Sequence, residues 1–186
     1  MNTKSKTVRR AADARLPTSF GEFQIIGYES LDTNHELVAL VKGKSRRNQP
    51  TLVSIHAQCF TGDVFGSLKC DCGPQLRAAI EMIERKGAGV VLYQQPGADE
   101  TNVNAQIELH DPLSTSLDLH LRYQQCAEIL DDLGVRRVRL LSGGPRERQL
   151  LEAIGLKVVA QPATVSPERS WRCQQQGMTP ADAMAI

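Results

Sequence analysis

Three of the chain's five cysteines lie in one short segment, CFTGDVFGSLKCDC, which covers residues 59–72. Cys70 and Cys72 are separated by one residue, so their side chains can point the same way from an extended segment. The ten residues between Cys59 and Cys70 form a loop long enough to bring the third sulfur to them. Three thiolates suit zinc, which binds sulfur at about 2.3 Å and has no redox chemistry. The spacing therefore predicts a zinc site held by three cysteines.

The motif itself contains no fourth ligand, and this leaves two interpretations. A catalytic zinc keeps one coordination position for a water molecule and lowers the pKa of that water. A structural zinc would be closed by a further side chain. Cys126 shares a helical face with leucine and isoleucine, which favours core packing for it. The spacing leaves both interpretations open, and the candidate fourth ligands are His56, Asp71, Cys126 and Cys173.

Composition narrows the class of protein. The chain has 186 residues, of which 41% are hydrophobic, and this fits one soluble domain with a sizeable core. Its 22 Lys and Arg nearly cancel its 21 Asp and Glu, so we expect no nucleic-acid or membrane partner. No apolar run approaches the roughly 20 residues that span a bilayer, and the N-terminus lacks the apolar core of a signal peptide. We therefore expect a cytoplasmic protein, in which clustered cysteines bind metal more often than they form disulfides.

Hydrophobic patterns predict alternating strands and helices. β-branched and apolar runs favour strands over residues 23–29, 36–42, 51–57, 89–94, 136–142 and 156–160. Helices are expected over residues 72–87, 117–134 and 146–155, with Pro74 in a first turn and Gly87 and Gly134 as stops. This alternation is typical of an α/β layered domain with a mixed sheet and flanking helices. We expect a mobile basic arm over residues 1–15, the domain over residues 16–160, and a C-terminal tail over residues 161–186.

The segment CFTGDVFGSLKCDCGPQL resembles the zinc motif of the GTP cyclohydrolase II family, C-x-T-G-D-x-x-x-S-x-(R/K)-C-D-C-G-x-Q-L. Flanking segments such as LPTSFGEFQIIGYE, GAGVVLYQQ and ILDDLGVRRVRLLS extend the similarity over roughly residues 16–159. The resemblance implies a GTP cyclohydrolase II-like fold and a homodimer. It also implies a zinc-bound water that opens the imidazole ring of a guanine nucleotide in riboflavin biosynthesis, with Mg²⁺ as a second metal.

Site residues can be carried over by position. The resemblance makes Cys59, Cys70 and Cys72 the zinc ligands. It assigns substrate binding to three further residues: His56 in the segment before the first cysteine, Gln75 after the last one, and Ser142 at the family's T-N-N-P turn.

Several positions depart from the family pattern, and they are positions at which the family has catalytic or substrate-binding residues. Ser54 replaces an arginine and Gln58 a glutamate, while Pro96 and Ala98 replace the glutamate and arginine of R-Q-E-G-R. Glu147 stands where the family has lysine. The changes at Ser54, Ala98 and Glu147 remove positive charges that would bind a triphosphate, and the glutamate lost at Gln58 is a possible proton carrier.

The family's D-x-R, which supplies a general base and an arginine, is also missing. The nearest remnant is DLHLR, which makes Asp118 and Arg122 the candidate catalytic residues. Their spacing of four would place them on one face of a helix, which is more typical of a structural ion pair than of catalysis.

The sequence therefore predicts a zinc-dependent hydrolase that acts on a purine nucleotide or a related heterocycle, with an altered substrate. One alternative is a catalytically impaired paralogue that keeps a structural zinc and has a binding or regulatory role. Another is a true GTP cyclohydrolase II whose catalytic residues have shifted.

Overall fold

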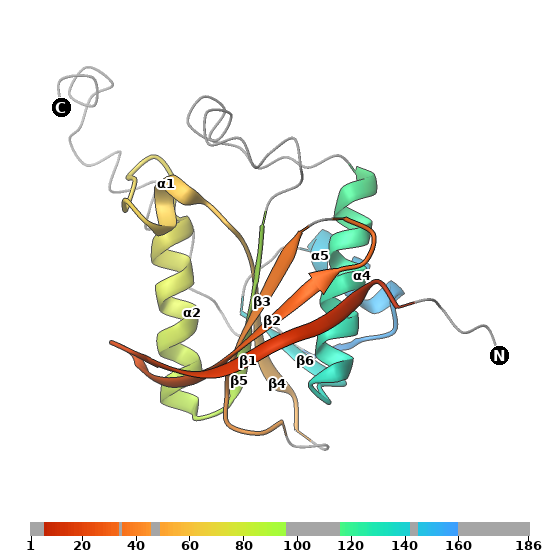
Figure 1. Cartoon of the computed structure of the whole chain (residues 1–186), viewed down its shortest axis with the longest axis horizontal. Helices are drawn as coiled ribbons and strands as arrows, with labels where there is room; N and C mark the ends of the chain where they lie inside the picture. The colour runs from red at the N-terminus through yellow and green to blue at the C-terminus, as the bar shows by residue number, and fades with distance from the viewer. Residues whose placement is uncertain (1–5, 34, 46–48, 96–115, 142–144, 160–186) are drawn as a thin grey trace.

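A seven-stranded mixed sheet forms the centre of the molecule (Figure 1). The computed structural model describes residues 6–33, 35–45, 49–95, 116–141 and 145–159. The strands are β1 (Val8–Thr18), β2 (Gly21–Ser30), β3 (Glu36–Lys42), β4 (Thr51–Ala57), β5 (Gly89–Gln94), β6 (Arg137–Leu140) and β7 (Lys157–Val159). Their order across the sheet is β1-β2-β3-β5-β4-β6-β7.

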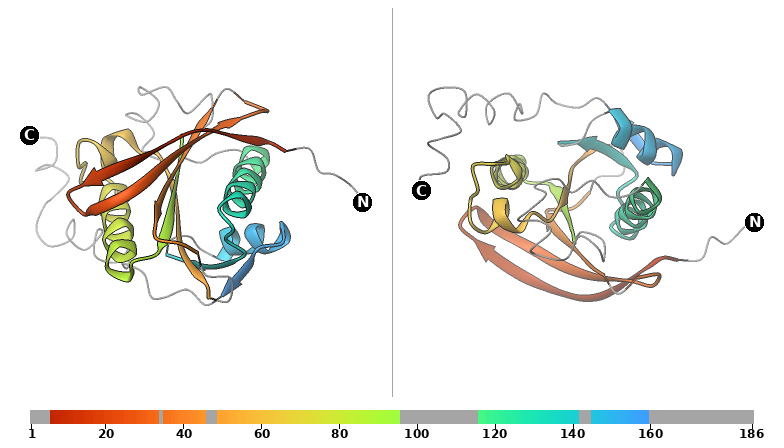
Figure 2. Two further views of the ribbon diagram at one scale, coloured as in Figure 1. Left: turned by 60° about the horizontal axis from the view of Figure 1, so that its bottom comes forward. Right: turned by 90° about the horizontal axis from the view of Figure 1, so that it is seen from above.

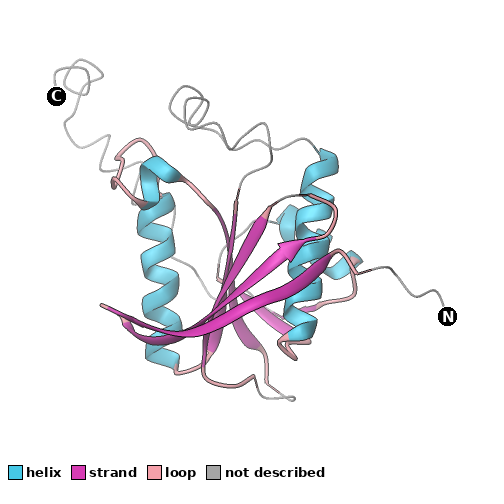
Figure 3. Ribbon diagram, viewed as in Figure 1, coloured by secondary structure: helices cyan, strands magenta, loops and turns pink. Residues whose placement is uncertain are grey.

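The sheet has an antiparallel half and a parallel half, which Figure 3 shows as one continuous twisted layer. β1, β2, β3 and β5 pair antiparallel with their neighbours. β5, β4, β6 and β7 pair parallel, and helices connect them. These helices are α1 (Phe60–Asp63), α2 (Cys72–Lys86), α4 (Ser116–Asp132) and α5 (Pro145–Ala153). The mixed α/β fold with flanking helices is thus confirmed.

Helices cover both faces of the sheet. α2 lies on one face and α4 and α5 lie on the other, as the view from above shows (Figure 2). The central strand β5 is buried on both sides: Val91 packs in the α2 layer, whereas Val90 and Leu92 pack in the α4 layer. This explains why GVVLYQ is a continuous apolar run rather than an alternating one.

Each long helix places an apolar stripe on the sheet. In α2, Leu76, Ile80 and Ile83 pack against one core, and Gly87 ends the helix with a left-handed φ of 71°. In α4, Cys126 and Ile129 belong to the other core, and Gly134 follows the helix with a φ of 70°. The stripes and both stop signals that the sequence predicted are confirmed.

The N-terminal arm requires a correction. The prediction of a mobile arm over residues 1–15 is wrong for residues 8–15, because they belong to β1, which pairs with β2 along its length. Most side chains of β1 are exposed, and these are mainly arginine and alanine, so the strand has no apolar alternation to reveal it. Main-chain pairing holds it in place, and the ion pairs of Arg9 with Glu29 and of Arg15 with Glu22 join it to β2. Charged residues are typical of such edge strands.

Candidate metal centre

The three cysteines lie where the chain leaves β4 and enters α2. Cys59 is the N-cap residue of the short helix α1, and Cys72 is the first residue of α2. Cys70 lies two residues before Cys72, in the loop that joins the two helices. The centre is therefore at the carboxyl end of the parallel strand β4, in the connection that leads to β5, and the next connection, from β5 through α4, crosses the opposite face of the sheet. In open α/β sheets this is the usual place for a ligand site.

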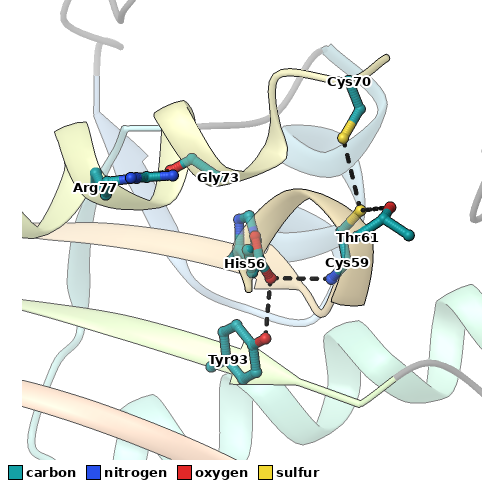
Figure 4. A network of polar contacts seen from close by, with 8 residues as sticks. His56, Cys59, Thr61, Cys70, Gly73, Arg77 and Tyr93 are labelled. Atoms are coloured by element: carbon teal, nitrogen blue, oxygen red, sulfur yellow. Dashed lines mark hydrogen bonds and ion pairs between the residues drawn. The ribbon is translucent and has the colours of Figure 1, made fainter. Parts of the chain in front are cut away.

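The distances between the sulfurs fit a tetrahedral metal ion. The Sγ atoms of Cys59 and Cys70 are 3.7 Å apart, and all three sulfurs lie within 4.8 Å of one another. Two sulfurs bound at about 2.3 Å to a tetrahedral zinc would lie about 3.8 Å apart. All three cysteines are reduced and half-buried. Figure 4 shows the sulfurs of Cys59 and Cys70 facing each other. The residues present thus fit a zinc ion.

Two glycines allow this close approach. A Cβ atom on Gly62 would lie 2.7 Å from the Sγ of Cys70 and 3.2 Å from the Sγ of Cys59. A Cβ atom on Gly73 would lie 2.2 Å from the carbonyl oxygen of Gly62. α1 and the first turn of α2 therefore touch through their backbones. This contact brings their cysteines together.

The electrostatics of the cluster favour a bound cation. Burial, together with the neighbouring sulfurs Cys59 and Cys70, raises the pKa of the Cys72 thiol far above its ordinary value. Burial also raises the pKa of Cys70. Three adjacent thiolates repel one another, whereas a divalent cation stabilises all three.

None of the candidate fourth ligands that the structure describes joins the three sulfurs. His56 binds Asp63, Asp71 accepts a hydrogen bond from the amide of Gln75, and Cys126 is fully buried in the core on the α4 side. Among all the described residues, no other histidine, cysteine or carboxylate has a ligand atom within 4.8 Å of all three sulfurs. Cys173 lies outside these residues. Within the described part of the chain the donor set is three sulfurs.

The buried carboxylate of Asp63 lies next to Cys59. Asp63, whose side chain is 5% exposed, accepts hydrogen bonds from His56 at 3.0 Å, the main-chain N–H of Cys59 at 3.0 Å and the hydroxyl of Tyr93 at 2.9 Å. Burial alone would raise the pKa of Asp63, but these donors lower it below its ordinary value. His56 and Tyr93 also stack, with ring centroids 5.6 Å apart.

The other candidate site residues are distributed over both faces of the sheet. Gln75 lies in the first turn of α2, three residues after the last cysteine. Arg122 is buried in α4, on the opposite face from α2. Asp118 also belongs to α4, and Ser142 lies outside the described residues. The structure thus places Gln75 and His56 beside the cysteines but Arg122 on the other side of the sheet.

Asp63, Tyr93 and Gly62 are site residues that the sequence analysis did not assign. The T-G-D of the zinc motif contains two of them, but that motif does not say which atoms they contact. Tyr93 could be found only once β4 and β5 were paired, since His56 and Tyr93 are register partners in that ladder.

The fold and the site define an α/β protein with a three-cysteine candidate metal centre at the carboxyl end of a parallel strand. The family model described as GTP cyclohydrolase II matches residues 9–163. The chain belongs to this family, as the sequence resemblance predicted.

Similar proteins support the same family. The riboflavin biosynthesis protein RibBA of Nocardia farcinica is 42% identical over 167 residues, which cover 82% of this chain and 40% of the relative. RibBA of Mycobacterium tuberculosis is 41% identical over 172 residues, which cover 83% of this chain and 40% of the relative. The chain thus spans about two fifths of the length of these relatives.

The fold also has a solved counterpart. The structure of RibBX, described as a two-domain 3,4-dihydroxy-2-butanone 4-phosphate synthase from A. baumannii, matches with a TM-score of 0.56 and 23% identity. The match covers 87% of this chain and 42% of that one. It supports the fold. Among the described residues, no helix is long and apolar enough to cross a membrane.

Proposed function

We propose that this chain is a zinc-dependent hydrolase of the GTP cyclohydrolase II type, which opens the ring of a purine nucleotide or a related heterocycle. The observation that carries the proposal is the set of three sulfurs within 4.8 Å of one another, two of them 3.7 Å apart, with no fourth ligand among the described residues. A zinc ion held there would act as a Lewis acid and make a bound water easier to deprotonate.

The protein's own residues have distinct parts in this proposal. Cys59, Cys70 and Cys72 hold the metal. Gln75 is proposed to contact the substrate, since its amide lies in the turn that follows the last ligand and Asp71 orients it. His56 is buried and bound to Asp63, so its proposed contribution to substrate binding is through the shape of the site. Ser142 is retained as a proposed substrate contact, and Asp118 and Arg122 as proposed catalytic residues.

The substrate is proposed to differ from the family's usual one. A nucleoside triphosphate carries about four negative charges, and each charge-assisted contact contributes roughly 1.5–3 kcal/mol. Ser54, which stands where the family has arginine, is buried at 2% exposure within the sheet and offers no cation to a ligand. Losing several such contacts weakens binding of a triphosphate by several kcal/mol. A role in riboflavin biosynthesis, Mg²⁺ as a second metal, a homodimer and a cytoplasmic location belong to the same proposal.

A second candidate function is a paralogue with structural zinc and a binding or regulatory role. The position of Arg122 favours it, because α4 packs on the face of the sheet opposite to the cysteines. In that case the retained metal would stabilise the fold without supporting hydrolysis.

Formate release separates the two functions. The full chain, purified without chelators, is incubated with a panel of purines, nucleosides and nucleotides, and a Cys70→Ser protein is the control. We expect about one zinc per chain, formate from at least one compound, and GTP turnover far slower than in a family member with the complete motifs. Zinc-loaded protein that releases formate from no compound on the panel supports the paralogue. Formate release from GTP at an ordinary rate would contradict the altered substrate.

A further inference from the structure

Asp63 connects three separate elements at one buried point. It is the last residue of α1, His56 belongs to β4, and Tyr93 belongs to β5. An ionised carboxylate only accepts hydrogen bonds, so the contact of His56 Nε2 with Asp63 Oδ1, at 3.0 Å, is a donation from the imidazole. Tyr93 donates to Oδ2 at 2.9 Å. The carboxylate thus fastens α1 to the carboxyl ends of two neighbouring parallel strands.

The same carboxylate closes the turn that carries Cys59. The N–H of Cys59 donates to Asp63 Oδ2 at 3.0 Å, and the N–H of Asp63 donates to the carbonyl oxygen of Cys59 at 2.7 Å. This pair of bonds joins the two ends of α1, a helix of only four residues that could not persist in isolation. The arrangement resembles a capping box, in which a side chain inside the first turn binds the N–H of the N-cap residue.

We infer that Asp63 is a positioning residue for the metal centre, and that its carboxylate fixes the main chain of Cys59 so that this sulfur faces Cys70 and Cys72. The inference rests on the metal site of the proposed function. Tyr93 and His56 hold the carboxylate, and the carboxylate holds the main chain of Cys59 (Figure 4). Hydrogen bonds that orient metal ligands typically change metal affinity by about 10–100-fold when removed.

Three variants and one matched control test this role. Asp63→Ala removes every acceptor, and Asp63→Asn leaves one acceptor oxygen for three donors. Tyr93→Phe removes a single donor and keeps the ring that stacks on His56. The control is Tyr28→Phe, because the hydroxyl of Tyr28 donates to Asp132 at 2.7 Å in the core on the α4 side. Tyr93→Phe and Tyr28→Phe thus each remove one tyrosine-to-aspartate hydrogen bond, on opposite faces of the sheet.

The measurements are made on the full chain. Zinc affinity is obtained by competition with a chromophoric chelator, and the absorption spectrum of the Co²⁺-substituted protein reports ligand geometry. We expect Asp63→Ala to weaken zinc binding about 10–100-fold and to change the cobalt spectrum. Asp63→Asn and Tyr93→Phe should weaken binding in the same direction by less. Tyr28→Phe should leave both readouts as in the wild type, even where thermal unfolding of the zinc-free protein shows a loss of stability.

Three results would overturn the inference. The first is a folded Asp63→Ala protein with the zinc affinity and cobalt spectrum of the wild type. The second is a loss of affinity in Tyr28→Phe as large as in Tyr93→Phe, which would show that general stability causes the effect. The third applies if Asp63→Ala does not fold, and it is unchanged affinity in both Asp63→Asn and Tyr93→Phe. A wild-type protein that binds no zinc is a separate outcome, since it removes the proposed function together with this inference.

Discussion

Gly62 has no room for a side chain, because it lies against the sulfurs of Cys59 and Cys70. We expect Gly62→Ala to displace the Cys70 sulfur, since the added Cβ atom would lie 2.7 Å from it. Zinc affinity, measured by chelator competition, should fall by about tenfold or more. The matched control is Gly27→Ala in β2, where the nearest atom to an added Cβ is 4.0 Å away. Equal zinc affinity in the two variants would contradict this account of the glycine.

Cys126 differs from the other three described cysteines in its environment. It is 0% exposed, and burial raises the pKa of its thiol to about 12. Below that pH the thiol form predominates, and the thiolate is the reactive form. After zinc removal, iodoacetamide at pH 8 should therefore modify the half-buried Cys59 but leave the fully buried Cys126 unmodified, as read by peptide mass spectrometry. Labelling of Cys126 in folded protein as fast as in denatured protein would show that this prediction is wrong.

At the scale of elements, α2 both covers the sheet and carries a candidate metal ligand. Ile83, in the last turn of this helix, is 0% exposed and packs in the core that includes Phe23 and Val91. We expect Ile83→Ala to lower the free energy of unfolding by about 2–5 kcal/mol, because it leaves a cavity between helix and sheet. Glu81→Ala, at an exposed position of the same helix, should change it by less than about 0.5 kcal/mol. Denaturant unfolding measures both, and equal effects would show that Ile83 does not stabilise this core.

Most elements were predictable because their patterns are local. β3, β4 and β5 have the predicted bounds, and α2 and α4 differ by one or two residues at their ends. β1 was missed because its exposed side chains, mainly arginine and alanine, give no alternation, and only its pairing with β2 defines it. α1 was missed because four residues carry no helical period. Elements that depend on tertiary contacts have no signal of their own in the sequence.

The same limit applies to the site. The spacing of the three cysteines predicted that their sulfurs would meet, and the structure brings them together. The hydrogen bonds around Asp63 depend on the register of two strands that are far apart in the chain, with His56 opposite Tyr93. This register between β4 and β5 follows from the tertiary structure and cannot be predicted from local sequence patterns.

At the scale of the whole molecule, topology explains where the site forms. β4 lies between β5 and β6, and the connections that leave β4 and β5 cross opposite faces of the sheet. Because these connections diverge, a ligand site can form at the carboxyl end of β4, and the cysteines lie at this end. The chain spans about two fifths of the length of its RibBA relatives, and the match to their family nevertheless includes this whole layered unit.

The central claim is that three cysteines hold one zinc ion and that its remaining position is left to solvent. X-ray absorption at the zinc edge of the full chain measures this coordination directly. We predict three sulfur ligands at about 2.3 Å and one oxygen ligand at about 2.0–2.2 Å, without the multiple scattering of an imidazole. Four sulfur ligands, an imidazole in the fourth position, or a chain that binds no zinc would contradict the account.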